Sequence, residues 1–61
     1  MNPRLLRTKA AARYLSVGEK YIRELILNGE LPYVPRKAAN SPFLIDVEDL
    51  NRWIQAHKTR A

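Results

Sequence analysis

Residues 8–32 read TKAAARYLSVGEKYIRELILNGELP and contain two helical patterns separated by a short turn. The first pattern, at residues 8–15, is rich in alanine, which favours helix and lets a second helix approach closely. The second pattern, at residues 19–28, repeats apolar residues at helical spacing. Its apolar stripe consists of Ile22, Leu25 and Ile26. We therefore expect two short helices that pack against each other.

The start of the second helix has two interpretations. Ser16 and Glu19 have the spacing of a capping box, which would begin the helix at Val17. Alternatively, Gly18 is the N-cap, and Val17 and Ile22 form a hydrophobic staple. We favour Gly18, because this choice places Val17 in the core. A linker of about three residues between the helices is typical of a helix-turn-helix.

The chain after Gly29 predicts a small hairpin and then a third helix. Gly29 suits the left-handed residue that ends a helix, and the prolines beyond it favour extended chain. Two short strands and the polar loop between them, at residues 36–42, form a predicted hairpin. Asp46 is the expected N-cap of a helix at residues 47–58. The predicted fold is mostly α, with three helices and a small two-stranded β-hairpin in one domain, residues 1–61.

Composition narrows the class of protein. The chain has 61 residues, eleven Lys plus Arg, six Asp plus Glu and a net charge of +5. This length allows one domain, and the basic balance favours an anionic polymer as partner. With no cysteine and one histidine, disulfides and Cys/His zinc sites are excluded, and we expect no metal or cofactor. Without a long apolar run or a signal peptide, we expect a cytoplasmic protein with no membrane partner.

The acidic residues do not predict an enzyme. Asp46, Glu48 and Asp49 are close in sequence, but their place at a predicted helix start complements the helix dipole. His57 has no partner of a second ligand type nearby and is expected to cover the edge of the core or the helix end. By contrast, residues 1–13 carry four basic side chains and no acid. The functional side chains are therefore expected among the cations.

The second helix presents the first candidate contacts with DNA. Opposite its apolar stripe lie Lys20 and Glu24, flanked by Tyr21 and Arg23. In a major groove, Lys20 or Arg23 would donate to guanine, Glu24 would accept from cytosine, and Tyr21 would suit a phosphate or a thymine methyl. The alternative is that Arg23 pairs with Glu19 one turn away on a solvated face.

A second group of candidates flanks this helix. Leu27 also points outward, where leucine is more typical of a protein or van der Waals contact than of a base contact. The start of the first helix and the hairpin loop supply cations and polar groups that suit phosphates or a minor groove. The alternative for the loop is that its side chains are simply solvated. These flanking candidates are Thr8, Lys9, Arg36, Lys37 and Asn40.

Three segments resemble a known family. LLRTKAAARYLSV at residues 5–17, NGELP at residues 28–32 and IDVEDLNRWI at residues 45–54 are similar to excisionase-type, MerR-like winged helix-turn-helix DNA-binding domains. The resemblance covers residues 5–57. It implies a recognition helix at residues 19–28 and a wing at residues 33–45.

The resemblance also implies a biological role. A short chain of this kind looks most like an excisionase, or recombination directionality factor, of a phage or other mobile element in a bacterial host. Such a protein binds repeated sites in double-stranded DNA of an attachment region, bends it and directs a tyrosine integrase toward excision. We expect several copies to bind side by side and to associate on DNA. A small winged-helix transcriptional regulator of a phage or mobile element is the alternative, since sequence does not discriminate the two.

Overall fold

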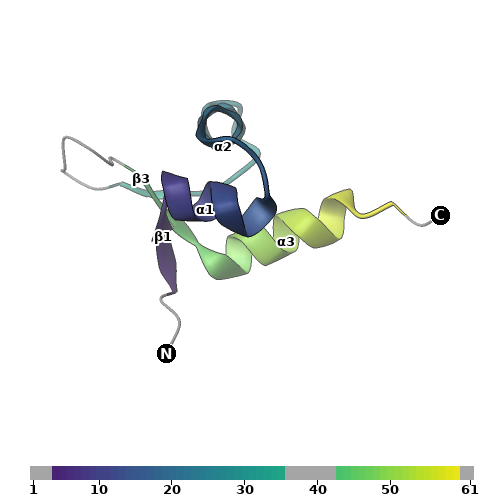
Figure 1. The fold of residues 1–61 in the computed structure, drawn as a ribbon. Coiled ribbons are helices and arrows are strands. Elements are labelled where there is room, and N and C mark those ends of the chain that lie inside the picture. Colours follow the sequence, from purple (N-terminus) through teal and green to yellow (C-terminus); the bar gives the residue numbers. More distant parts are fainter. Residues whose placement is uncertain (1–3, 36–42, 60–61) are drawn as a thin grey trace.

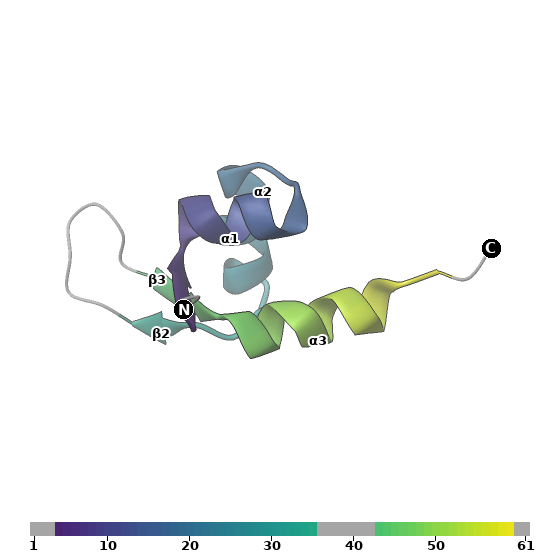
Figure 2. The same ribbon diagram turned by 60° about the horizontal axis from the view of Figure 1, so that its bottom comes forward.

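The order of elements follows the predicted helices, with one strand added before them. The computed structural model describes residues 4–35 and 43–59. Within these ranges the elements are β1 (Leu5–Arg7), α1 (Thr8–Leu15), α2 (Glu19–Leu27), β2 (Val34–Pro35), β3 (Phe43–Asp46) and α3 (Val47–His57). α1 lies between α2 and α3, and the strands gather at one end (Figures 1 and 2). The described chain is thus a winged helix-turn-helix.

The turn between α1 and α2 is held by backbone hydrogen bonds. Ser16 is the C-cap of α1 and is left-handed, with φ 58°, and its N–H donates to the carbonyl of Arg13 at 3.1 Å. The N–H of Val17 donates to the carbonyl of Ala12 at 2.9 Å. Gly18, with an extended backbone, is the N-cap of α2. The favoured assignment of Gly18 is confirmed, and Ser16 belongs to the end of α1.

Gly29 ends α2 in the way the sequence predicts. Its φ of +76° is left-handed, and the chain that follows turns back so that the N–H of Glu30 donates to the carbonyl of Leu25 at 2.9 Å. Asn28 is the C-cap, so α2 ends at Leu27, one residue before the predicted end. The reversal brings Leu31 into the core, where it is 1% exposed.

The sheet has one strand more than the predicted two-stranded wing. β2 and β3 form the antiparallel wing, with Val34 opposite Leu44. β1 pairs with the other edge of β3, with Leu6 opposite Ile45, which gives the order β1-β3-β2. The hydrophobic pattern of residues 5–7 is too short to predict a strand by itself. Its long-range pairing with β3 makes β3 the central strand of the described sheet.

α3 begins at the predicted cap. The side chain of Asp46 accepts a hydrogen bond from the backbone N–H of Glu48 at 2.9 Å, and the N–H of Val47 donates to the carbonyl of Arg4 at 2.8 Å. The helix ends at His57 instead of the predicted residue 58, because the backbone of Lys58 is extended. The Asp46 cap and the hydrogen bond to Arg4, the residue before β1, therefore both hold the N-terminal end of α3.

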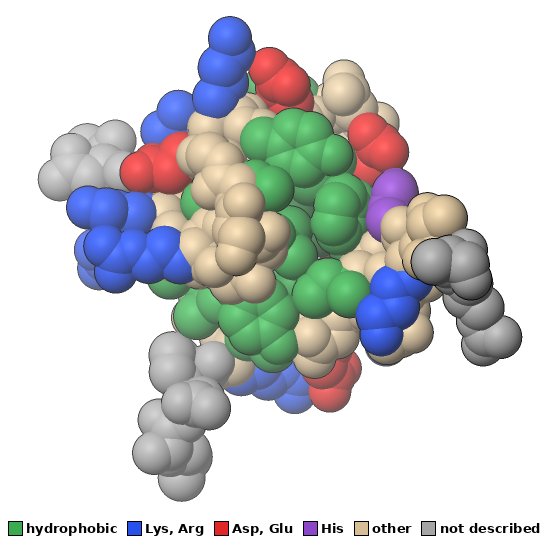
Figure 3. All heavy atoms as spheres, turned by 45° about the vertical axis from the view of Figure 1, so that its right-hand side comes forward, with side chains coloured by type: hydrophobic (Ala, Val, Ile, Leu, Met, Phe, Trp, Pro, Cys, Tyr) green, Lys and Arg blue, Asp and Glu red, His purple; other side chains and the backbone are tan. Residues whose placement is uncertain are grey.

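The core joins all three helices to the central strand. It consists of Ala11, Ala12, Ile22, Leu25, Ile26, Leu31, Ile45 and Leu50. Trp53, predicted to be in the core, is half-buried and packs against these residues. The ring of His57 stacks on Trp53 with centroids 4.2 Å apart, as expected for a histidine at the core edge. Figure 3 shows this histidine at the rim of a gathering of hydrophobic side chains.

Candidate nucleic-acid interface

α2 presents its polar side chains on the face opposite the core. Ile22, Leu25 and Ile26 are buried, which fixes the rotation of the helix about its axis. The four predicted base-contacting residues are all exposed: Lys20, Tyr21, Arg23 and Glu24. The structure thus brings these four together on one short helix, in the position of the second helix of a helix-turn-helix.

Two anchors hold the N-terminal turn of α2. The carbonyl of Gly18 accepts hydrogen bonds from the N–H groups of Tyr21 and Ile22, at 3.1 and 3.3 Å. The ring of Tyr21 lies edge-on to Trp53 of α3, with centroids 6.3 Å apart, and the residue remains 42% exposed. Tyr21 therefore braces α2 against α3 while part of its surface remains accessible.

Arg23 forms the ion pair that the sequence offered as an alternative to DNA contact. One guanidinium nitrogen of Arg23 lies 3.3 Å from a carboxylate oxygen of Glu19, one helical turn earlier. Both side chains are well exposed, so this contact contributes little to stability. A guanidinium has five N–H donors, and a single contact leaves donors for a second partner. Pairing with Glu19 and contact with a base are compatible.

Leu27 is the most exposed large hydrophobic residue of the described chain. It is 77% exposed at the last position of α2, on the same side as Lys20 and Glu24. A lone exposed leucine is ordinary on protein surfaces. Its position nevertheless puts an apolar group within the polar face of α2.

The first-helix candidates divide into one exposed and one buried residue. Lys9 is exposed and, within residues 4–35 and 43–59, has no carboxylate within ion-pair distance. Thr8 is only 7% exposed, because β1 leads directly into α1 and turns its first residue toward the core. The side chain of Thr8 therefore has little surface to offer a phosphate.

The wing candidates Arg36, Lys37 and Asn40 lie outside the described residues. The structure fixes the two strands that precede and follow them. β2 ends at Pro35 and β3 begins at Phe43, and the ring of Phe43 packs edge-on against Tyr33 with centroids 5.0 Å apart. The wing is thus anchored at its base by an antiparallel pair and an aromatic contact.

Three of the six acidic residues lie at the start of α3. Arg4 contacts both Asp46 and Glu48 at the start of α3, at 3.0 and 3.5 Å, and Arg52 contacts Asp49 at 3.3 Å. The hydrogen bond from the backbone N–H of Glu48 and the contact with Arg4 hold the pKa of Asp46 below its usual value. These acids serve the start of α3 and its ion pairs, as the sequence predicts.

Two further cations belong to the basic surface and were not predicted as contacts. Arg7 and Arg13 are exposed beside Lys9, and none of the three has an ion-pair partner in the described part of the chain. The sequence signal was present, because residues 1–13 contain basic residues and no acid. Sequence could not show that a strand and a helix place Arg7 and Arg13 on either side of one depression.

The described residues contain no arrangement typical of a metal centre. Within residues 4–35 and 43–59, no three His, Cys, Asp or Glu side chains are close enough to hold a metal ion together. None of the helices in these ranges has the length and apolar character needed to cross a membrane. The observed polar features are those of a charged surface built on a small helical scaffold.

Comparison with known proteins assigns the chain to a family. The family model of the helix-turn-helix domain matches residues 5–58, which is nearly the entire sequence. The protein belongs to the helix-turn-helix domain family, a family of small DNA-binding domains that includes excisionase-like proteins. Searches of curated proteins and of solved structures found no match. The matched residues include all the helices and strands of the described chain.

Proposed function

We propose that the protein binds double-stranded DNA sequence-specifically with α2 in the major groove. The observation that carries this proposal is the exposed face of α2. It combines Lys20, Arg23 and Glu24 on a helix whose orientation is fixed by a buried stripe. An α-helix fits the major groove, where base edges differ most in their hydrogen-bonding groups. The membership of the chain in the helix-turn-helix family supports the same docking.

The side chains of α2 suit particular base edges. Lys20 and Arg23 donate hydrogen bonds and match the O6 and N7 acceptors of guanine, whereas Glu24 matches the N4 donor of cytosine. Tyr21 suits a phosphate or the methyl group of thymine. Together these contacts favour a target rich in G·C pairs beneath the N-terminal half of α2.

Phosphate contacts on both sides of α2 would set its register on the duplex. Lys9 at the start of α1 supplies one exposed cation. Arg36, Lys37 and Asn40 of the wing segment supply the second set, suited to phosphates or to the minor groove. The contact surface proposed here thus extends from α1 across α2 to the wing.

The decisive experiment compares two variants that remove the same ion pair. A duplex target is first selected from a randomised library, and binding is measured by fluorescence anisotropy. Arg23→Ala removes the cation, whereas Glu19→Gln breaks the pair and keeps the cation. We expect Arg23→Ala to weaken binding about 5- to 150-fold, the range for one lost base contact, and Glu19→Gln to retain the affinity of the wild-type protein.

Lys58→Ala serves as the matched control, since it removes an exposed cation beyond the end of α3. Circular dichroism must show that all variants are folded. Full affinity of Arg23→Ala for the selected duplex would contradict the assignment of α2 as the recognition helix. An equal loss of affinity in Lys58→Ala would show that binding depends on net charge and not on a specific contact of Arg23.

For the biological role, we propose an accessory DNA-bending protein of the excisionase type. Support comes from the resemblance of residues 5–57 and from a family that includes excisionase-like proteins. In this role the protein binds repeats in an attachment site in a bacterial cytoplasm, and a tyrosine integrase performs strand exchange. Bending 20–30 base pairs by 40–90° costs on the order of 1–6 kcal/mol, which favours several copies bound together. Leu27 is placed to contact DNA or a neighbouring copy.

An excision assay tests this role. The substrate is a plasmid carrying the attachment sites of the element that encodes the protein, incubated with the integrase of that element. We expect the protein to stimulate excision and to suppress reintegration. Unchanged recombination, together with a binding site that overlaps a promoter and altered transcription in vitro, would instead identify a transcriptional regulator.

A further inference from the structure

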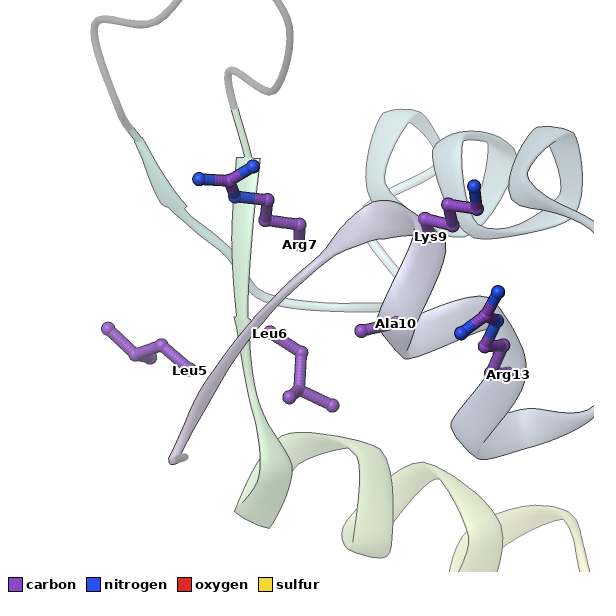
Figure 4. A pocket seen from close by; sticks show the side chains of 6 residues that line it. All are labelled: Leu5, Leu6, Arg7, Lys9, Ala10 and Arg13. Carbon is purple, nitrogen blue, oxygen red and sulfur yellow. The ribbon is translucent and has the colours of Figure 1, made fainter. Parts of the chain in front are cut away.

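A groove between β1 and α1 combines an apolar floor with a cationic rim. Its lining residues are Leu5, Leu6, Arg7, Lys9, Ala10 and Arg13, and its volume is about 320 Å³. Figure 4 shows that one wall comes from the strand and the other from the helix, with Leu6 and Ala10 between them and Arg7 and Lys9 above the leucines. No acidic residue is among the lining residues. The groove is therefore both apolar and electropositive.

The cations of this rim form no ion pair within the described residues. Arg7 and Arg13 have no ion pair within residues 4–35 and 43–59, unlike Arg4, Arg23 and Arg52. Arg7 is the last residue of β1, and Arg13 lies in the last turn of α1 (Figure 4). Lys9 lies on the side of the groove nearest α2 (Figure 4), so Arg7 and Arg13 are the two cations left for a ligand other than DNA.

We infer that this groove binds an acidic, leucine-bearing peptide segment of a partner protein. An apolar side chain of such a segment would fill the space above Leu6 and Ala10, and its carboxylates would meet the guanidinium groups of Arg7 and Arg13. A DNA backbone offers the negative charge but has no apolar side chain to fill the space. The inference does not rest on DNA binding, and it would let the domain hold DNA and a second protein at once.

Two fluorescent model peptides of equal charge test the inference. One alternates leucines with pairs of aspartates, and the other carries serine at every leucine position. At physiological salt, we expect the full-length protein to bind the leucine peptide at least about tenfold tighter, because a buried leucine contributes that much or more. Amide shifts in NMR spectra should concentrate at residues 5–13. Equal binding of the two peptides would overturn the inference.

Variants distinguish the contribution of the charged rim to peptide binding from that of the apolar space between β1 and α1. Arg13→Gln should weaken binding of the leucine peptide about threefold, whereas Lys58→Gln, which also removes one exposed cation, should leave it unchanged. Ala10→Leu partly fills the groove and should remove most of the advantage of the leucine peptide over the serine peptide. If Ala10→Leu retained that advantage while circular dichroism showed it folded, the groove would not be the binding site.

A third experiment tests whether duplex DNA binds in the same groove as the peptide. A duplex of random sequence should shift amides of α2 and leave the leucine peptide bound, because Lys9 is the only lining residue of the groove that also belongs to the proposed DNA contacts. Displacement of the peptide, together with duplex-induced shifts at Leu5 and Ala10, would assign the groove to the DNA backbone and overturn the inference. Since the peptide experiments contain no DNA, their failure would leave the proposed DNA binding intact.

Discussion

Leu25 and Leu27 lie two residues apart on opposite sides of α2 and have opposite environments. Leu25 is 3% exposed in the core, whereas Leu27 is 77% exposed. Leu25→Ala should lower the free energy of unfolding by about 2–5 kcal/mol, through lost burial and a residual cavity. That is a large share of the roughly 3–9 kcal/mol expected for a domain of this length. Leu27→Ala should change it by less than about 0.5 kcal/mol.

Urea denaturation followed by circular dichroism measures both changes. The two variants remove the same atoms from the same helix, so helix propensity cancels in the comparison. Similar losses in the two variants would contradict the burial pattern of α2.

The two glycines that flank α2 should respond in opposite ways to substitution. Gly29 is left-handed at φ +76°, so Gly29→Ala should destabilise by about 1 kcal/mol although the space around it is open. Gly18 has an extended backbone with no side-chain cap, so Gly18→Ser should stabilise by a few tenths of a kcal/mol. Thermal unfolding measures both. A stabilising Gly29→Ala would contradict the left-handed end of α2.

The start of α3 predicts a specific loss of stability in acid. The hydrogen bond from the Glu48 N–H and the contact with Arg4 lower the pKa of Asp46 in the folded state. The resulting stabilisation is fully present above the pKa of unfolded aspartate, about 3.9, and is lost as the pH falls through the lower folded value. Asp46→Asn keeps a capping oxygen and removes the charge.

Melting temperatures measured from pH 7 to pH 2 test whether the charge of Asp46 stabilises the start of α3. The wild-type protein should melt above Asp46→Asn at neutral pH, and the difference should shrink below about pH 4. A difference that does not vary with pH would show that the charge of Asp46 is irrelevant to the cap.

Among the elements, the helices could be predicted from sequence and the third strand could not. Helical spacing, Gly18, Gly29 and Asp46 are local signals, and each helix was placed to within a residue of its end. β1 has only three residues, and its partner β3 lies far away in the sequence. A pairing of that range leaves no local pattern. The burial of Thr8 was missed for the same reason, because β1 sets the direction in which α1 starts.

The candidate contact residues also divide into those that the sequence could predict and those that it could not. The exposed face of α2 followed from its periodicity, since burying one stripe leaves the opposite side to solvent. Arg7 and Arg13 carried a sequence signal in the acid-free run of residues 1–13. Their joint position around a groove depends on how β1 and α1 are arranged in space, which composition does not encode.

For the whole molecule, the charge of +5 predicts strongly salt-dependent DNA binding. Each neutralised phosphate should add about −0.9 to the slope of log affinity against log salt concentration. Lys9→Gln, which removes a proposed phosphate contact, should reduce the slope by about one and weaken binding to all sequences alike. Anisotropy titrations at several salt concentrations on the selected and a scrambled duplex measure this. An unchanged slope would exclude Lys9 from the DNA interface.

The pairing of β1 with β3 has a consequence for the order in which the molecule assembles. Leu6 and Ile45 are opposite each other in the sheet although they are about forty residues apart in the chain. Closing so long a loop is entropically costly, whereas α1 and α2 meet across a short turn. We therefore expect the helical pair to form early and β1 to join last. In native-state hydrogen exchange, the amide of Val47, bonded to Arg4, should open before those of Ile26 and Leu25.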